Sequence, residues 1–228
     1  MSIHDGHRQR LKERFRSEGL DNFNDIQVLE LLLFYAVPRQ DTNPIAHALL
    51  ERFGTLAQVL EAPVSELEKV KGVGHNAAVL LSLAPQLGRR YQVSKMMNTS
   101  ILTSVEACGR YLIPYFFGRR NEMVFILCLD AKCKVLGCVE VGEGSVNSAG
   151  VPIRRIVETA LAYNATTVVL AHNHPSGLAL PSGEDVQTTH RVAAALNAVE
   201  ISLADHIVVA DDDFVSIVQS GYYRPDEV

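Results

Sequence analysis

The sequence predicts a two-domain chain, with an all-helical domain over residues 1–95 followed by an α+β or α/β domain over residues 101–228. Two observations lead to this division. Apolar residues in the first hundred positions recur at helical spacing, whereas strand-like apolar runs alternate with amphipathic helices after residue 100. Between the two patterns lies the polar run QVSKMMNTS, residues 92–100, which is the best candidate for a linker.

The first domain is expected to consist of short helices. Residues 7–18 are highly charged with a narrow apolar stripe, while residues 28–35 (VLELLLFY) are apolar nearly all round and predict the buried helix of this domain. Pro38 should end that helix, because proline cannot donate a backbone hydrogen bond. Further helical segments are predicted at residues 45–52 after Pro44, at 56–60, at 66–70 with Ser65 as N-cap, and at 76–91.

The second domain is expected to hold one mixed sheet flanked by at least two helices. Residues 123–130 and 134–141 are strand-like runs around a short turn, which predicts a hairpin. Residues 152–163 carry apolar side chains at helical spacing, and residues 167–171 (TVVLA) predict a buried strand. The remaining elements are a helix at 182–196 and a strand pair at 201–209 and 214–217.

Composition favours an ordinary globular protein of the cytoplasm. The chain has 228 residues, of which 47% are hydrophobic and 21% charged. No apolar run approaches the roughly 20 residues of a membrane span, and the N-terminus MSIHDGHRQRLKERF is too charged for a secretory signal. Four cysteines without a Cys-x-x-Cys pair are expected to stay reduced. The net charge of −5 argues against a protein that coats nucleic acid.

Residues 172–185 (HNHPSGLALPSGED) have the composition and spacing of a metal site. His172 and His174 come where a buried strand ends, so both can turn toward one ion. Ser182 is a natural N-cap for the next helix, which places Asp185 at position N3 in its first turn. Two histidine nitrogens and one carboxylate oxygen leave a fourth tetrahedral position open, which is typical of catalytic zinc. Each residue alone has a simpler interpretation, such as a loop histidine or a helix cap, and the joint pattern carries the prediction.

That joint pattern resembles the signature of the JAMM (MPN+) metalloproteases. The segments AHNHPSG, ADHIVV and KGVG also resemble the bacterial RadC family across nearly the whole chain. The resemblance implies a JAMM domain, with a mixed sheet flanked by helices, behind a helix-hairpin-helix domain. It also implies a glutamate at the start of a sheet strand that acts on a zinc-bound water. The residue at that place is Glu122; from the residues alone a solvated carboxylate at the start of a strand is the preferred interpretation, and the resemblance reverses that preference.

The chemistry implied by the resemblance is zinc-dependent hydrolysis of a peptide or isopeptide bond in a peptide or protein substrate. Glu122 would accept a proton from the water and deliver it to the leaving amine. The Ser182 hydroxyl would stabilise the oxyanion of the intermediate, a role worth roughly 10²–10³ in rate for one donor. Asn173 and Ser176 are expected to shape the loop, and His206 to support the site or the fold.

Residues 67–80 (LEKVKGVGHNAAVL) match a helix-hairpin-helix pattern. The turn Lys71, Gly72, Val73 and Gly74 could point backbone N–H groups at a phosphate, with both glycines free to adopt positive φ. Such a contact reads the DNA backbone without sequence preference. The other interpretation is a tight hairpin used only for packing, since residues 1–100 carry 12 basic against 11 acidic residues.

Two other functions stay open at this point. One is a non-catalytic DNA-binding or adaptor protein in which the metal site is structural, and the other is a metal-dependent nuclease. RadC proteins carry a DNA-repair name, which by itself does not decide between these functions. A single zinc with one carboxylate ligand suits phosphodiester cleavage less well than a two-metal site. The sequence leaves the substrate and the oligomeric state undetermined.

Overall fold

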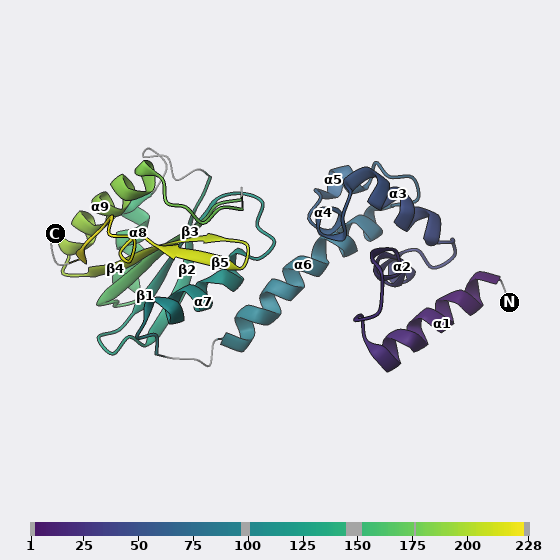
Figure 1. Ribbon diagram of the computed structural model, residues 1–228, viewed down its shortest axis with the longest axis horizontal. Coiled ribbons are helices and arrows are strands. Elements are labelled where there is room, and N and C mark those ends of the chain that lie inside the picture. Colours follow the sequence, from purple (N-terminus) through teal and green to yellow (C-terminus); the bar gives the residue numbers. More distant parts are fainter. Residues whose placement is uncertain (1–2, 97–100, 145–151, 176, 226–228) are drawn as a thin grey trace. The chain divides into compact units, whose positions relative to one another are not determined.

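The computed structural model describes residues 3–96, 101–144, 152–175 and 177–225. Contacts between residues divide the chain into two compact units, Met1–Gly88 and Arg89–Val228 (Figure 1). No helix in these described ranges is long and apolar enough to cross a membrane. As predicted, the first unit is helical and the second combines a sheet with helices.

The N-terminal unit packs its short helices around one apolar core. Leu29 and Leu33 of α2 and Leu49 of α3 are completely buried there, so the apolar run of α2 forms the centre of the unit, as its composition predicts. Leu67 and Leu81 complete the core from the two sides of the Lys71–Gly74 turn. The helices described in this part are α1 (Ile3–Glu18), α2 (Asp25–Ala36), α3 (Asn43–Phe53), α4 (Leu56–Leu60), α5 (Val64–Leu67) and α6 (His75–Met96).

Several predicted helix boundaries in this part are wrong. Helix α5 spans Val64–Leu67 with Pro63 as its N-cap, whereas the prediction was a helix over residues 66–70 with Ser65 as its N-cap. The Pro63 carbonyl accepts hydrogen bonds from the N–H groups of Glu66 and Leu67, so the first turn closes two residues earlier than the prediction. Helix α6 continues to Met96, whereas the linker was expected to begin at residue 92. Residues 92–96 contain no proline or glycine to stop the helix, and residues 97–100 lie outside the described residues.

The C-terminal unit is built on a five-stranded sheet in the order β2-β1-β3-β4-β5. Strands β3 and β4 are parallel and the other neighbours are antiparallel, so the sheet is mixed, as expected. The hairpin predicted from the two apolar runs is the pair β1–β2. The strands are β1 (Met123–Leu129), β2 (Val135–Glu143), β3 (Thr167–Asn173), β4 (Ser202–Ala210) and β5 (Asp213–Ser216).

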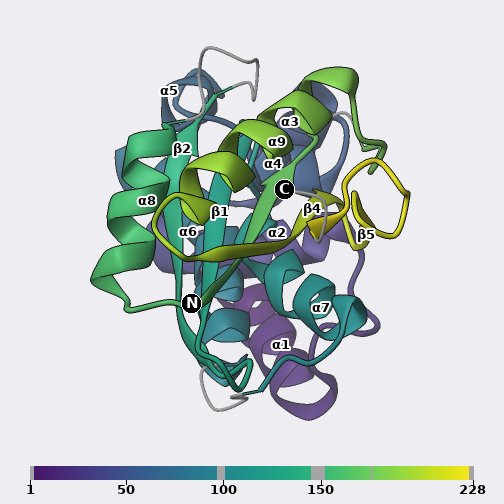
Figure 2. The ribbon, with the colours of Figure 1, turned by 90° about the vertical axis from the view of Figure 1, so that its left-hand side faces the viewer.

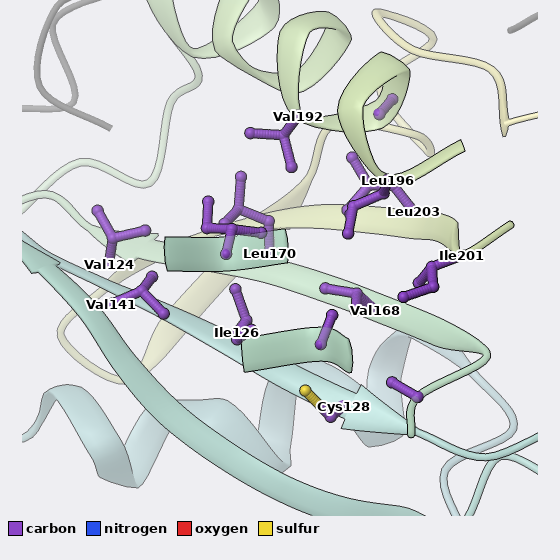
Figure 3. Packing of buried hydrophobic residues seen from close by; sticks show 14 of the residues in the cluster. Val124, Ile126, Cys128, Val141, Val168, Leu170, Val192, Leu196, Ile201 and Leu203 are labelled. Atoms are coloured by element: carbon purple, nitrogen blue, oxygen red, sulfur yellow. The ribbon is translucent and has the colours of Figure 1, made fainter. Parts of the chain in front are cut away.

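Helices cover both faces of this sheet (Figure 2). Helices α8 (Ile153–Ala162) and α9 (Gly183–Asn197) pack on one face, where Val192 of α9 points toward Leu170 of β3 and Leu196 of α9 lies beside Leu203 of β4 (Figure 3). Helix α7 (Val105–Phe116), which the sequence analysis did not predict, packs on the other face. Residues at even positions of β1 and β3 face α8 and α9, and those at odd positions face α7. This alternation decides on which side the site lies.

Candidate metal centre

Two neighbouring elements deliver the three predicted metal ligands. His172 lies near the end of β3 on the face of Leu170, and its ring is completely buried. His174 follows just after the strand, and Asp185 lies in the first turn of α9. The structure brings these three residues together, with one ligand atom of each within 4.8 Å of the others.

The start of α9 orients the carboxylate of Asp185. Ser182 is the N-cap and forms the predicted capping box, in which its Oγ accepts from the N–H of Asp185 at 3.2 Å. Asp185 Oδ2 in turn accepts from the N–H and from the hydroxyl of Ser182, both at 2.7 Å. The two carboxylate oxygens face different histidines, since Oδ1 lies 3.1 Å from His172 Nε2 and Oδ2 lies 3.6 Å from His174 Nε2.

The distances fit a tetrahedral zinc site. Ligand atoms about 2.0–2.1 Å from an ion at tetrahedral angles are separated by roughly 3.3–3.4 Å. Here His172 Nε2 lies 3.0 Å from His174 Nε2 and 3.1 Å from Asp185 Oδ1, and His174 Nε2 lies 3.6 Å from Asp185 Oδ2. Two imidazoles and one carboxylate are a donor set that zinc accepts, with one position left open.

Electrostatics and hydrogen bonding prepare these groups for a cation. Burial by itself raises the pKa of Asp185, but the hydrogen bond and charge of His172, with the bonds from Ser182, hold that pKa well below its usual range. His174 Nδ1 lies 3.1 Å from the carbonyl oxygen of Leu178. A carbonyl only accepts, so Nδ1 carries the proton and the lone pair of His174 Nε2 faces the other ligands.

Glu122, the predicted base, immediately precedes β1 and is half-buried. Val124 is paired with His172 across the β1–β3 ladder. Because side chains alternate along a strand, Glu122, two residues before Val124, belongs to the same face of the sheet as His172. The resemblance named Glu122 by its position in the family pattern, and the strand register supplies an independent physical reason to consider it.

Asn173 holds the chain on both sides of Glu122. Its Oδ1 accepts from the N–H of Met123 at 2.7 Å, and its Nδ2 donates to the carbonyl of Asn121 at 3.2 Å. The Asn173 side chain therefore reaches across to the start of β1, whereas the sequence analysis expected it to shape its own loop. Ser176, the other residue expected to shape that loop, lies outside the described residues.

His206 of β4 is in direct contact with the ligands. Its Nε2 lies 2.8 Å from His172 Nδ1, and its Nδ1 lies 2.7 Å from the hydroxyl of Thr189. Burial, together with the neighbouring His172, lowers the pKa of His206 well below its usual value, so the ring is neutral. Sequence reasoning missed Thr189, although its place one helical turn after Asp185 is a signal that it lies on the same face of α9.

The turn predicted to contact nucleic acid belongs to the N-terminal unit. Gly72 has φ +94°, and a Cβ there would lie 2.8 Å from Cδ1 of Ile45, so glycine is required for packing. Gly74 does not adopt positive φ, contrary to the prediction; its carbonyl accepts the first hydrogen bonds of α6. Lys71 and Gly74 are exposed, while Val73 is buried in the core.

Comparison with known proteins agrees with this geometry. The family model of the RadC-like JAB domain matches residues 102–222, which include the three ligands and Glu122. Over 216 residues the chain is 35% identical to UPF0758 protein SPO0054 of Ruegeria pomeroyi, and the alignment covers 95% of this chain and 96% of that protein. The chain therefore belongs to the RadC family, with a RadC-like JAB domain over residues 102–222.

Proposed function

We propose that the protein is a zinc-dependent hydrolase of the JAMM type that cleaves a peptide or isopeptide bond. The observation that carries the proposal is that ligand atoms of His172, His174 and Asp185 lie within 4.8 Å of one another, with His172 Nε2 3.0 Å from His174 Nε2 and 3.1 Å from Asp185 Oδ1. Membership of a JAB-domain family supports it. Zinc held there would lower the pKa of a water molecule and polarise a carbonyl group.

Two residues would act on the reacting groups. Glu122, on the face of the sheet that carries His172, would accept the proton of the water and pass it to the leaving amine. Ser182 is proposed to donate to the oxyanion, for which its hydroxyl must first turn away from Asp185 Oδ2. Until it turns, the same hydroxyl holds Asp185 in position, so Ser182 would contribute to metal binding as well as to catalysis.

The proposal is tested by replacing Glu122 with glutamine. Glu122→Gln should retain zinc but cleave a panel of peptides roughly 10²–10⁴-fold more slowly than the parent protein, as expected for loss of a general base. Glu143→Gln is the matched control, because Glu143 pairs with Met123 across the β1–β2 ladder and so belongs to the opposite face. Incubation of Glu122→Gln with cell extract would then retain the substrate for identification. Zinc-loaded Glu122→Gln that cleaves as fast as the parent protein would refute the mechanism.

We also propose that the Lys71–Gly74 turn contacts a DNA backbone weakly. Exposed Lys71 and the exposed start of α6 support this contact, whereas the ion pair of Lys69 with Glu66 and the carboxylate of Glu68, 2.7 Å from His75 Nδ1, oppose it. Lys71→Glu should lower duplex affinity and reduce its salt dependence by about one phosphate contact. Unchanged binding by this variant would leave the turn with a packing role.

The two rival functions have their own outcomes. A non-catalytic adaptor would bind zinc and duplex DNA but turn over no peptide in the panel. A nuclease would cleave DNA in a reaction that His174→Ala abolishes. The single carboxylate among the three ligands favours amide hydrolysis over phosphodiester cleavage.

A further inference from the structure

Four buried groups form a continuous chain of hydrogen bonds behind the metal centre. The Thr189 hydroxyl donates to the carbonyl oxygen of Asp185 at 2.7 Å and lies 2.7 Å from His206 Nδ1. His206 Nε2 lies 2.8 Å from His172 Nδ1. The chain therefore begins at the backbone of one metal ligand and ends at the ring of another, and it joins α9, β4 and β3.

The carbonyl of Asp185 determines the direction of the two bonds that the Thr189 hydroxyl makes in this chain. A carbonyl oxygen only accepts, so the single hydroxyl hydrogen of Thr189 is given to it. Thr189 Oγ can then only accept from His206, which places a proton on His206 Nδ1. The second nitrogen of this completely buried ring, Nε2, faces His172 Nδ1 at 2.8 Å.

The last bond concerns the metal ligand itself. To bind a metal ion through Nε2, His172 must carry its proton on Nδ1 and donate it to His206 Nε2, which can accept because Thr189 places the proton of His206 on Nδ1. We propose that Thr189 and His206 are positioning residues that hold His172 in the tautomer able to bind a metal ion. This proposal rests on the metal site proposed above and does not depend on the hydrolytic reaction.

The acceptor behind His172 is unusual in its chemistry. A metal-binding histidine ordinarily donates its second N–H to a carboxylate, a carbonyl or water. A carboxylate or a carbonyl can only accept, and water accepts readily. A neutral imidazole can donate or accept through the same nitrogen, depending on its tautomer. His206 alone therefore could not select the tautomer of His172, and Thr189 is needed to select that of His206.

Helix α9 contains a matched control for this proposal. Thr188 and Thr189 are adjacent and almost completely buried. Within the part of the chain that the structure describes, the Thr188 hydroxyl has no hydrogen-bond partner, whereas that of Thr189 has two contacts. Valine replaces the hydroxyl of either residue by a methyl group, so the two Thr→Val changes differ only in the hydrogen bonds removed.

The first experiment measures zinc affinity by competition with a chromophoric chelator. Thr189→Val should weaken zinc binding about 10–100-fold, the usual effect of removing a group that supports a metal ligand. Thr189→Ser retains the hydroxyl and should bind like the parent protein, as should Thr188→Val. Equal weakening by Thr188→Val and Thr189→Val, or no rescue by serine, would overturn the proposal. Circular dichroism verifies that each variant is folded.

The second experiment needs no variant. Imidazole ¹⁵N shifts of the zinc-loaded protein report where each ring carries its proton, and His206 should carry its proton on Nδ1 and accept at Nε2. A proton on His206 Nε2 would overturn the proposal. Because this measurement needs no turnover, it stands even if the protein proves to lack hydrolytic activity, so failure of the relay and failure of the proposed function are distinguishable.

Discussion

Replacing Asn173 with alanine would remove the two hydrogen bonds that hold the chain on both sides of Glu122. The more important is the 2.7 Å bond from the N–H of Met123, a residue that is only 1% exposed. A buried donor left without its acceptor costs about 1–3 kcal/mol. For a unit of about 140 residues, each kcal/mol shifts the melting temperature by roughly 3–4 °C. Asn173→Ala should therefore melt about 3–12 °C lower.

The assay is calorimetry of the zinc-free protein, followed by zinc content and peptide cleavage of the loaded protein. Asn173→Asp keeps an acceptor for Met123 but loses the donor to Asn121, so it should recover part of the stability. Asn121→Ala removes an exposed side chain from the same segment, together with its solvent-exposed 2.8 Å hydrogen bond to Glu143 Oε1, and should change stability by less than about 1 kcal/mol. If Glu122 is the base, Asn173→Ala should lose turnover while retaining zinc, because a displacement near 1 Å can cost about 10²-fold. A free energy of unfolding within about 0.5 kcal/mol of that of the parent protein would refute the reasoning.

Three other predictions follow from the same structure. Ser182→Ala removes the N-cap of α9 and should lower the free energy of unfolding by about 1 kcal/mol, measured by urea denaturation, with Ser182→Thr retaining most of it. Burial raises the pKa of the Cys108 thiol to about 11, so at pH 8 it should react with a disulfide reagent far more slowly than the partly exposed Cys133; equal rates, resolved by mass spectrometry, would contradict this. Gly109→Ala places a Cβ 2.4 Å from the Phe214 ring and should destabilise the protein by about 1–3 kcal/mol in the same urea assay, so an unchanged midpoint would contradict the packing.

Local patterns were sufficient for most elements of the fold. The strands, helices α8 and α9 and the Ser182–Asp185 capping box follow from side chains within one or two turns of each other, so the sequence predicted them. Helix α7 was missed although Ser104 caps it and Cys108, Leu112 and Phe116 form its buried stripe. The N-cap and the apolar stripe of α7 are therefore also local features of the sequence, and they were sufficient to predict this helix.

The sequence by itself determined the candidate ligands, because His172, His174 and Asp185 lie within fourteen residues on a strand, a loop and a capped helix. Only the tertiary structure decided which groups support them. Met123 meets Asn173 across 50 residues of chain, and His172 meets His206 across 34. Such contacts depend on strand register, since a slip of one residue would turn every side chain to the other face. The direction of the protons behind the metal centre follows from those contacts and could not be read from spacing.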